Sequence, residues 1–215
     1  MKKAPWISIE GVDGAGKSSH VDGIIHFLKA QGFEVVSTRE PGGTDLGERL
    51  RDEILNTPMS LQTEILLAFA VRAEHLEKVV VPALSEGKAV VCDRFTDSTY
   101  AYQGAGSGGV MSHIETLENM VHPNLNPDLT LLFDLPPEES LKRLGGTGKT
   151  PDKFESKGKD YFEKVRNEYL ARAQKDPSRI KVVSSLPALP EVKKSVQEAL
   201  VEFISSWHQK PRFKV

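Results

Sequence analysis

The chain has 215 residues, of which 39% are hydrophobic and 27% charged, as in an ordinary globular protein. Its formal net charge of −2 disfavours a protein built to coat nucleic acid or an anionic membrane. One cysteine, Cys92, excludes an intramolecular disulfide framework and a zinc site with several cysteine ligands. The length fits a single domain over residues 1–215.

The first residues, MKKAPWISIEGVDG, contain no long apolar run before Glu10, so we expect no secretory signal peptide. No run of about 18 uncharged apolar residues occurs elsewhere, and we expect no membrane-spanning helix. The sequence therefore predicts a cytoplasmic protein whose partners are neither nucleic acid nor a membrane.

Short apolar runs alternate with longer amphipathic runs along the chain. The apolar runs predict strands at 6–10, 33–37, 89–92, 129–133 and 180–183. The amphipathic runs predict helices at 17–30, 45–56, 60–86, 111–121, 137–144, 156–175 and 190–208. This alternation is typical of an α/β fold in three layers, a five-stranded parallel sheet flanked by helices. Ligands of such sheets bind beyond the carboxyl ends of the strands.

A glycine-rich segment follows the first strand. Residues 11–18, GVDGAGKS, match the pattern G-x-x-x-x-G-K-[ST] of a P-loop, with a predicted strand before them and a helix after them. Glycines allow backbone N–H groups to surround phosphate oxygens, and the helix N-terminus adds a favourable dipole. Lys17 is expected to reach the outer phosphates of a nucleotide, and Ser18 to offer its hydroxyl to Mg²⁺. The fold class is therefore that of a P-loop NTPase.

Polar segments also follow the second and third strands. TREPGGT, at 38–44, is rich in glycine and proline and could be only a turn. Asp93 and Arg94 follow the third strand; a carboxylate there can support Mg²⁺, and an arginine can bind a phosphate through two parallel hydrogen bonds. Taken alone, such a pair could equally be a structural ion pair.

Residues 142–159 carry six basic and two acidic side chains. The run GGTGKT at 145–150 looks like a second phosphate loop, but Arg143 occupies the position of the first glycine and the run follows a helix. A solvated surface loop is one interpretation. The alternative that we favour is a lid at about 143–157, where glycines allow a hinge and lysines match a phosphate ligand.

Together these segments resemble the thymidylate kinase family, P-loop nucleoside monophosphate kinases that phosphorylate dTMP with ATP. The resemblance covers nearly the whole chain and rests on EGVDGAGKS at 10–18, TREPGGT at 38–44, LLAFAVRAEHL at 66–76, DRF at 93–95, STYAYQG at 98–104 and DKFE at 152–155. The P-loop alone specifies only an NTPase. TREPGGT and DRF followed by AYQG, at these intervals, are much more specific.

The resemblance implies transfer of the γ-phosphoryl group of ATP to dTMP, giving dTDP and ADP for dTTP synthesis, with Mg²⁺ as cofactor. It also implies site residues at the positions that match the family's motifs. ATP would be bound by Gly11, Val12, Asp13, Gly14, Ala15, Gly16, Lys17, Ser18, Ser19 and Arg143. dTMP would be bound by Asp13, Glu40, Pro41, Phe69, Arg72, Arg94, Thr99, Tyr102, Gln103 and Phe154. The metal would lie near Ser18, Asp93 and Glu155, and the catalytic residues would be Lys17, Asp13, Asp93, Arg94 and Lys149.

Five of these residues have more detailed expected roles. By resemblance, Arg72 would hydrogen-bond the thymine and Phe69 would stack on it. Thr99 and Gln103 would contact the base edge, and Tyr102 would crowd a ribose 2′-hydroxyl. Helix core is the alternative for Phe69 and Tyr102, and a surface ion pair is the alternative for Arg72.

The lid departs from the family pattern. Some family members carry an arginine inside the P-loop, where this chain has Gly14, and members with glycine there usually supply a lid arginine. This lid has no arginine between Gly145 and Phe162, and Lys149 stands nearest to the equivalent position. We therefore expect Lys149 to neutralise developing charge, although a lysine cannot form a bidentate pair. Arg143 would instead cover the adenine.

Three other functions fit the same motifs. A nucleoside monophosphate kinase for another base would share the chemistry. Only the expected base contacts Arg72, Thr99 and Gln103 argue against it. A P-loop GTPase switch would need an [NT]-K-x-D element, which the chain lacks. A nucleotide-binding chain that has lost activity through its lid would keep the same P-loop. The family is usually a homodimer, which the apolar face of 60–86 permits.

Overall fold

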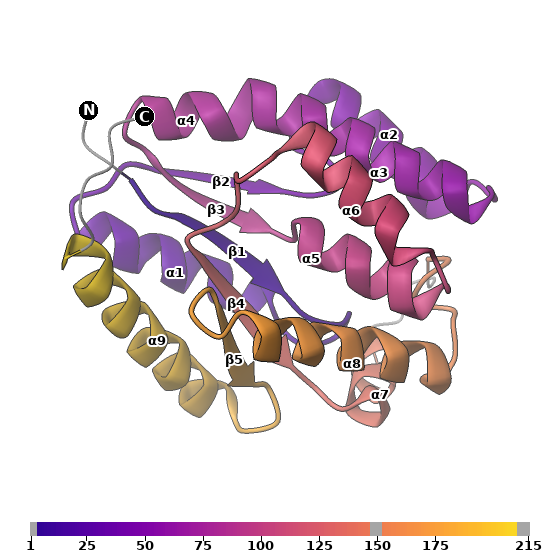
Figure 1. Ribbon diagram of the computed structural model, residues 1–215. Coiled ribbons are helices and arrows are strands. Elements are labelled where there is room, and N and C mark those ends of the chain that lie inside the picture. Colours follow the sequence, from indigo (N-terminus) through magenta and orange to yellow (C-terminus); the bar gives the residue numbers. More distant parts are fainter. Residues whose placement is uncertain (1–3, 147–151, 210–215) are drawn as a thin grey trace.

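The computed structural model describes residues 4–146 and 152–209, and Figure 1 shows their arrangement. The strands are β1 (Trp6–Glu10), β2 (Val35–Arg39), β3 (Ala89–Asp93), β4 (Leu129–Asp134) and β5 (Ile180–Ser184). The α-helices are α1 (Ser18–Ala30), α2 (Asp45–Asn56), α3 (Leu61–His75), α4 (Val81–Ser85), α5 (Thr96–Thr99), α6 (Met111–Val121), α7 (Pro137–Gly145), α8 (Lys159–Lys175) and α9 (Leu189–Gln209). Two π-helical segments are η1 (Leu76–Val80) and η2 (Tyr100–Gly106).

The five strands form one parallel sheet in the order β2-β3-β1-β4-β5, which confirms the predicted sheet. β1 lies in the middle, with Ile7 aligned to Val91 of β3 on one side and to Leu129 of β4 on the other. The three central strands are buried almost throughout, whereas the edge strands β2 and β5 are partly exposed. Since strands covered on both faces need apolar side chains in both directions, the central strands read as continuous apolar runs.

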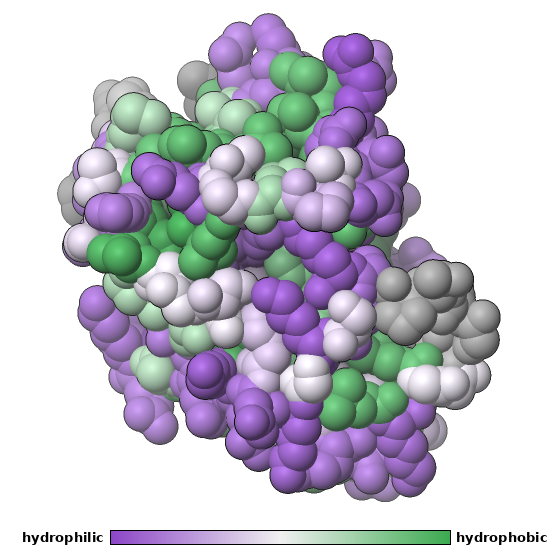
Figure 2. All heavy atoms as spheres, turned by 90° about the vertical axis from the view of Figure 1, so that its right-hand side faces the viewer, coloured by the Kyte–Doolittle hydropathy of each residue, from purple (hydrophilic) through white to green (hydrophobic). Residues whose placement is uncertain are grey.

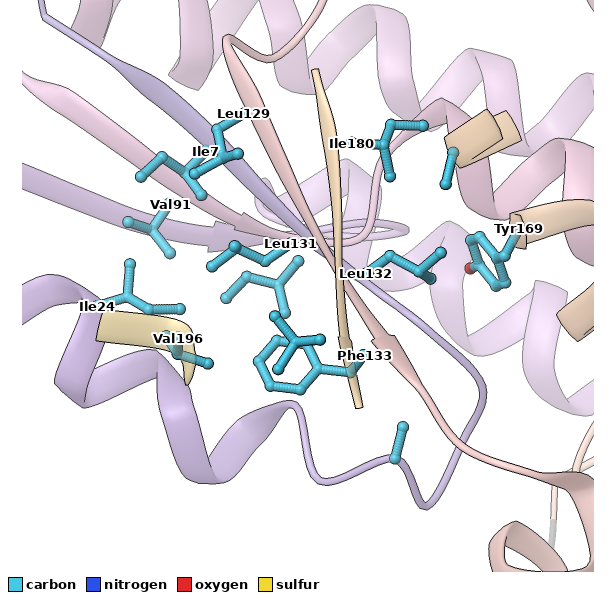
Figure 3. Close-up of a cluster of buried hydrophobic side chains, with 14 of the residues drawn as sticks. Ile7, Ile24, Val91, Leu129, Leu131, Leu132, Phe133, Tyr169, Ile180 and Val196 are labelled. Atoms are coloured by element: carbon cyan, nitrogen blue, oxygen red, sulfur yellow. The ribbon is translucent and has the colours of Figure 1, made fainter. Parts of the chain in front are cut away.

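Helices cover both faces of the sheet, as predicted. α1 and α9 pack together against one face, while η1–α4, α5 and α8 lie on the other (Figure 1). Figure 3 shows the resulting core: Ile24 of α1 and Val196 of α9 approach from one side, and Tyr169 of α8 from the other. Within the described ranges, no helix is both long and apolar enough to cross a membrane.

Several predicted elements differ in their bounds by one to three residues, and two of the differences have a clear physical reason. β2 begins two residues later than predicted, because the Phe33 ring leaves the strand to pack edge-on against Trp207, with ring centroids 5.8 Å apart. The predicted helix 60–86 continues as α3, η1 and α4. Pro82 lacks the N–H that an α-helix would bond to the carbonyl four residues earlier, and the wider π turns lie directly before it.

The segment 96–106 is helical, which the sequence analysis did not predict. No element was predicted there, but α5 and η2 run through it, and α8 packs against η2. The glycines permit this close packing: a Cβ at Gly104 would lie 2.7 Å from the Met111 sulfur, and a Cβ at Gly106 would lie 2.7 Å from the Tyr161 ring. The helical backbone carries Thr99, Tyr102 and Gln103 to the carboxyl edge of the sheet.

Candidate active site

The P-loop connects β1 to α1 in the predicted position. Gly11 has φ of 136°, and a Cβ there would lie 2.4 Å from the Phe133 carbonyl oxygen, so only glycine fits. Lys17 Nζ donates to the carbonyl oxygens of Gly11 (3.0 Å) and Val12 (3.1 Å), inside the loop itself. Burial and the charge of Arg94 lower the pKa of Lys17 to about 8.

The two serines that open α1 are exposed, and their hydroxyls are therefore accessible to a bound nucleotide. At the other side of the loop, Arg143 Nη1 donates to Gly14 O (3.4 Å) and Nη2 donates to Ser185 O (2.8 Å). Arg143 thereby bridges the P-loop and the segment after β5, and its expected contact with the adenine stays a prediction.

A cavity begins at the P-loop and extends along the carboxyl edge of β3. Its walls come from the P-loop, the loop after β2, α2, α3, the β3–α5 region, η2 and the lid. They are formed by Asp13, Glu40, Pro41, Arg51, Ile54, Leu55, Ala68, Arg72, Arg94, Phe95, Ser98, Thr99, Tyr102, Gln103, Asp152 and Phe154. Of the residues expected to bind dTMP, all except Phe69 line it.

At the end of the cavity nearest the P-loop, Arg94 is held by several partners. Its backbone has φ of 72°, unusual for a residue other than glycine. Nη2 donates to Asp13 Oδ1 and to the Tyr102 hydroxyl (3.1 Å), and Nη1 donates to the Gly11 carbonyl oxygen (3.0 Å). Lys17 and Arg94 thus share one carbonyl acceptor. Burial disfavours the charge of Asp13, but Arg94 and Lys17 hold the pKa of its carboxyl below the usual value.

A buried carboxylate, Glu10, lies beneath Arg94 and was not singled out from the sequence. It accepts hydrogen bonds from the Phe95 N–H (2.6 Å), the Ser98 hydroxyl (2.6 Å) and the Tyr169 hydroxyl (2.8 Å). Both hydroxyls also accept hydrogen bonds from Arg94 Nη1, each at 3.2 Å. Burial raises the pKa of Glu10 to about 7, with help from the charge of Asp97.

At the far end, Arg72 is almost completely buried. Its Nε donates to Glu40 Oε2 (2.8 Å), and its Nη2 donates to the Thr99 hydroxyl (3.1 Å). Nη1 is buried and has no hydrogen-bond partner among the described residues. The Glu40–Pro41 peptide bond is cis.

Phe69 is not among the residues that line the cavity, and its expected stacking role stays a prediction. Its ring lies behind Arg72, 4.7 Å from the guanidinium carbon, and stacks against His122 with centroids 6.4 Å apart. Ala68 lines the cavity instead. The reason is helical geometry: residues four apart share a face, so Ala68 and Arg72 face the cavity together, while Phe69 is rotated toward the core.

The lid contacts the cavity through its second half. Lys153 pairs with Glu64 of α3 (2.6 Å), and the same carboxylate accepts a hydrogen bond from Gln103 Nε2 (2.8 Å). Glu155 Oε2 accepts from the Asp152 N–H (3.1 Å), so this carboxylate contacts the lid's own backbone and is absent from the cavity wall. Lys149, the expected lid cation, lies outside the described residues.

Arg51 is a cavity residue that the sequence analysis missed. Its Nη1 donates to the Pro41 carbonyl oxygen (2.8 Å), and burial lowers the pKa of its guanidinium. A signal was present: Arg51, Ile54 and Leu55 recur at helical spacing directly behind the TREPGGT segment, and all three line the cavity.

Comparisons with known proteins agree on one family. The family model of thymidylate kinase matches residues 9–196. The thymidylate kinase of Methylobacillus flagellatus is 50% identical over 198 residues, which cover 92% of this chain and 97% of that protein. The thymidylate kinase of Cupriavidus taiwanensis is 46% identical over 200 residues, covering 92% and 98%.

A solved structure gives the same answer. The crystal structure of thymidylate kinase from Ehrlichia chaffeensis superposes with a TM-score of 0.74 at 31% identity, covering 92% of this chain and 98% of that chain. Family model, sequence relatives and structure all extend over most of the chain, so the resemblance found in the motifs is confirmed. The chain belongs to the thymidylate kinase family, whose members are phosphotransferases that act on dTMP.

Proposed function

We propose that this chain transfers the γ-phosphoryl group of ATP to dTMP, giving ADP and dTDP for dTTP synthesis. One observation carries the proposal: Asp13 belongs to the P-loop and also lines the cavity, where it pairs with Arg94. A nucleotide on the P-loop and a monophosphate in the cavity would therefore meet end to end. Such alignment is the main requirement of phosphoryl transfer.

Arg94 and Arg51 would hold the acceptor phosphate, because their guanidinium groups lie in the wall of the cavity. The attacking oxygen belongs to a phosphate that is already anionic, so no strong general base is required. The residues instead neutralise charge and orient the reactants. Lys17 would move from its P-loop carbonyls to the phosphates of ATP.

At the end of the cavity near Arg72, the protein leaves one hydrogen-bond donor unpartnered, and this donor suits thymine. The unpartnered Nη1 of Arg72 needs an acceptor such as a base carbonyl oxygen, since a buried donor without a partner is costly. Thr99 and Gln103 would contact the base edge. Tyr102 and Phe154, with ring centroids 5.9 Å apart, would enclose the sugar and leave little room for a 2′-hydroxyl.

The residues beside the P-loop, where ATP would bind, fit Mg²⁺. Asp93 Oδ1 is buried without a hydrogen-bond partner in the described part of the chain, and the exposed Ser18 opens α1. Mg²⁺ binds proteins through one or two carboxylates together with substrate phosphates and water, which suits this pair. The ion would neutralise phosphate charge when bound. Glu155 is left out of the proposed set because its contacts are within the lid.

A lid at about 143–157 would close over the phosphates and exclude water. The Lys153–Glu64 pair supports a closed position for its second half. Lys149 would bring positive charge to the transferring group. We assign all of residues 1–215 to one kinase domain, built on the single described sheet.

A homodimer is part of the proposal. Leu66 on α3 is 50% exposed, and Val110 and Met111 at the start of α6 are 54% and 37% exposed. Figure 2 shows apolar side chains gathered in the upper part of the face on which α6 lies. Sedimentation would test the assembly. The predicted cytoplasmic location belongs to the proposal too, and cell fractionation tests it.

A coupled ADP-release assay with ATP, Mg²⁺ and dTMP, dUMP, dGMP or AMP in turn tests the function. We expect strong release with dTMP and weak release with the others. Strong release with a different monophosphate would keep the reaction and overturn the base assignment. Release that needs no acceptor would favour a nucleotide switch, and no release at all would favour a binding protein without turnover.

A further inference from the structure

Behind Arg72 lies a buried chain of polar side chains that contacts no part of the P-loop. Glu40 and Arg72 are 2% and 3% exposed, and His75 is fully buried. His75 Nδ1 lies 2.8 Å from Glu40 Oε1, and His75 Nε2 lies 2.7 Å from the Thr38 hydroxyl. Each Glu40 oxygen therefore has its own partner, Arg72 on one side and His75 on the other.

The chemistry of Glu40 fixes the direction of its hydrogen bond with the ring. A carboxylate only accepts, so His75 Nδ1 must carry a proton and donate it to Glu40. Nε2 faces the Thr38 hydroxyl, which can donate to it. Arg72 and Glu40 cancel in charge, which suits a buried pair.

The loop after β2 closes directly over the imidazole. Gly43 has φ of 80°, and a Cβ there would lie 2.6 Å from His75 Cδ2 and 2.7 Å from the Thr38 hydroxyl oxygen. The second glycine of TREPGGT is thus needed both for its backbone conformation and for the space that His75 occupies. The histidine fills the junction between β2 and α3.

We propose that His75 is a positioning residue for recognition of the acceptor base. It holds one oxygen of Glu40, so that the other oxygen meets only Nε of Arg72, Nη2 stays on the Thr99 hydroxyl, and Nη1 is left for the ligand. A carboxylate released from His75 can pair with Nε and Nη2 of the guanidinium through both oxygens. That pairing would take Nη2 from Thr99 and turn the guanidinium, so that Nη1 no longer points to the base. The inference rests on the proposed function. It adds the residue that holds Arg72 in the arrangement that recognises thymine.

The variants His75→Leu and His75→Asn test this role. Leucine removes both hydrogen bonds, and we expect KM for dTMP to rise about tenfold while kcat and KM for ATP stay near their original values. Asparagine places an amide N–H close to the position of Nδ1, so it can still donate to Glu40. We expect His75→Asn to restore most of the affinity for dTMP and most of its preference over dUMP and dGMP.

Val80→Ala is the matched control, because Val80 is fully buried on η1, which continues α3 directly after His75, and has no polar side-chain group. It should lower Tm without changing KM for dTMP. If His75→Leu lowers Tm but leaves KM and base preference unchanged, the residue is merely structural and the inference is overturned. Equal KM values for the leucine and asparagine variants would overturn it as well.

Two further measurements keep the test decisive. Should His75→Leu not fold, Thr38→Val removes only the donor to Nε2, and a smaller rise in KM for dTMP is expected. An unchanged KM in that variant would count against the role. A wild-type chain without dTMP-dependent ADP release would overturn the proposed function itself, whereas an active wild-type chain with insensitive variants would overturn only the role of His75.

Discussion

The two ends of the cavity each contain an arginine paired with a carboxylate. The pairs differ in burial and in whether every terminal nitrogen of the arginine has a hydrogen-bond partner. Arg94 and Asp13 are 16% and 26% exposed, and both terminal nitrogens of Arg94 have protein partners. Arg72 and Glu40 are 3% and 2% exposed, and one nitrogen of Arg72 has no partner in the ranges described. A phosphate can be bound by charge in a partly hydrated site. Selecting one base requires a site that excludes water and holds a buried donor whose acceptor only that base supplies.

The largest expected effect is on the phosphate end. Arg94→Leu should lower kcat/KM for dTMP by about a thousandfold, because the arginine contacts charge that develops during transfer. Steady-state ADP release measures it. Arg166→Leu is the control, since Arg166 pairs with Asp134 at the end of β4 and lies outside the cavity. A loss of less than tenfold for Arg94→Leu would contradict its role.

The next effect concerns stability at the base end. Arg72→Leu leaves Glu40 buried without its positive partner, and we expect the free energy of unfolding to fall by about 3 kcal/mol or more. Arg94→Leu should cost less, because Asp13 keeps contact with water. Urea denaturation of both variants gives the comparison. Equal losses would show that the two pairs do not differ as described.

Substitutions of the two lid lysines, Lys149 and Lys153, should affect different kinetic constants. Lys149→Ala should lower kcat about tenfold, because this cation would act on the transferring group. Lys153→Ala breaks the pair with Glu64, which also holds Gln103, and should instead raise KM for dTMP about threefold. Initial rates over a range of dTMP concentrations distinguish these effects. An unchanged kcat in Lys149→Ala would remove Lys149 from the mechanism.

The last expected effect is a pH dependence of stability from Glu10. Its pKa is raised from 4.5 to about 7, so between these values the folded chain holds a proton that the unfolded chain has lost. The free energy of unfolding should therefore fall as pH rises through this window, by up to about 1.4 kcal/mol per pH unit. Glu10→Gln should flatten the slope in urea titrations from pH 5 to 8. A variant with the wild-type slope would assign the dependence to other groups.

The P-loop could be predicted in full because eight consecutive residues carry it, and its neighbours on both sides have strong periodicity. The acceptor cavity draws on seven separate segments, and only the family resemblance brought most of its members together. Phe69 shows what that transfer leaves open: its stacking role stays a prediction, and one residue along α3 separates it from Ala68, which lines the cavity. Sequence spacing cannot detect a shift of one residue unless the helix phase is fixed.

Helical segments rich in glycine were the other failure. Residues 96–106 have turn composition, yet contacts with α8 and Met111 make them helical, so tertiary packing overrides local preference. Glu10 escaped notice for a similar reason. Its three donors come from Phe95, Ser98 and Tyr169, which lie far from it in sequence.

The shared carbonyl oxygen of Gly11 joins the two substrate sites. Lys17 Nζ and Arg94 Nη1 both lie 3.0 Å from it, and the two cations repel each other there. A nucleotide that draws Lys17 toward its phosphates relieves Arg94, and a monophosphate on Arg94 relieves Lys17. We therefore expect each substrate to strengthen the binding of the other, by the same factor in both directions as thermodynamic linkage requires. Donor and acceptor sites would then be coupled through a single peptide group.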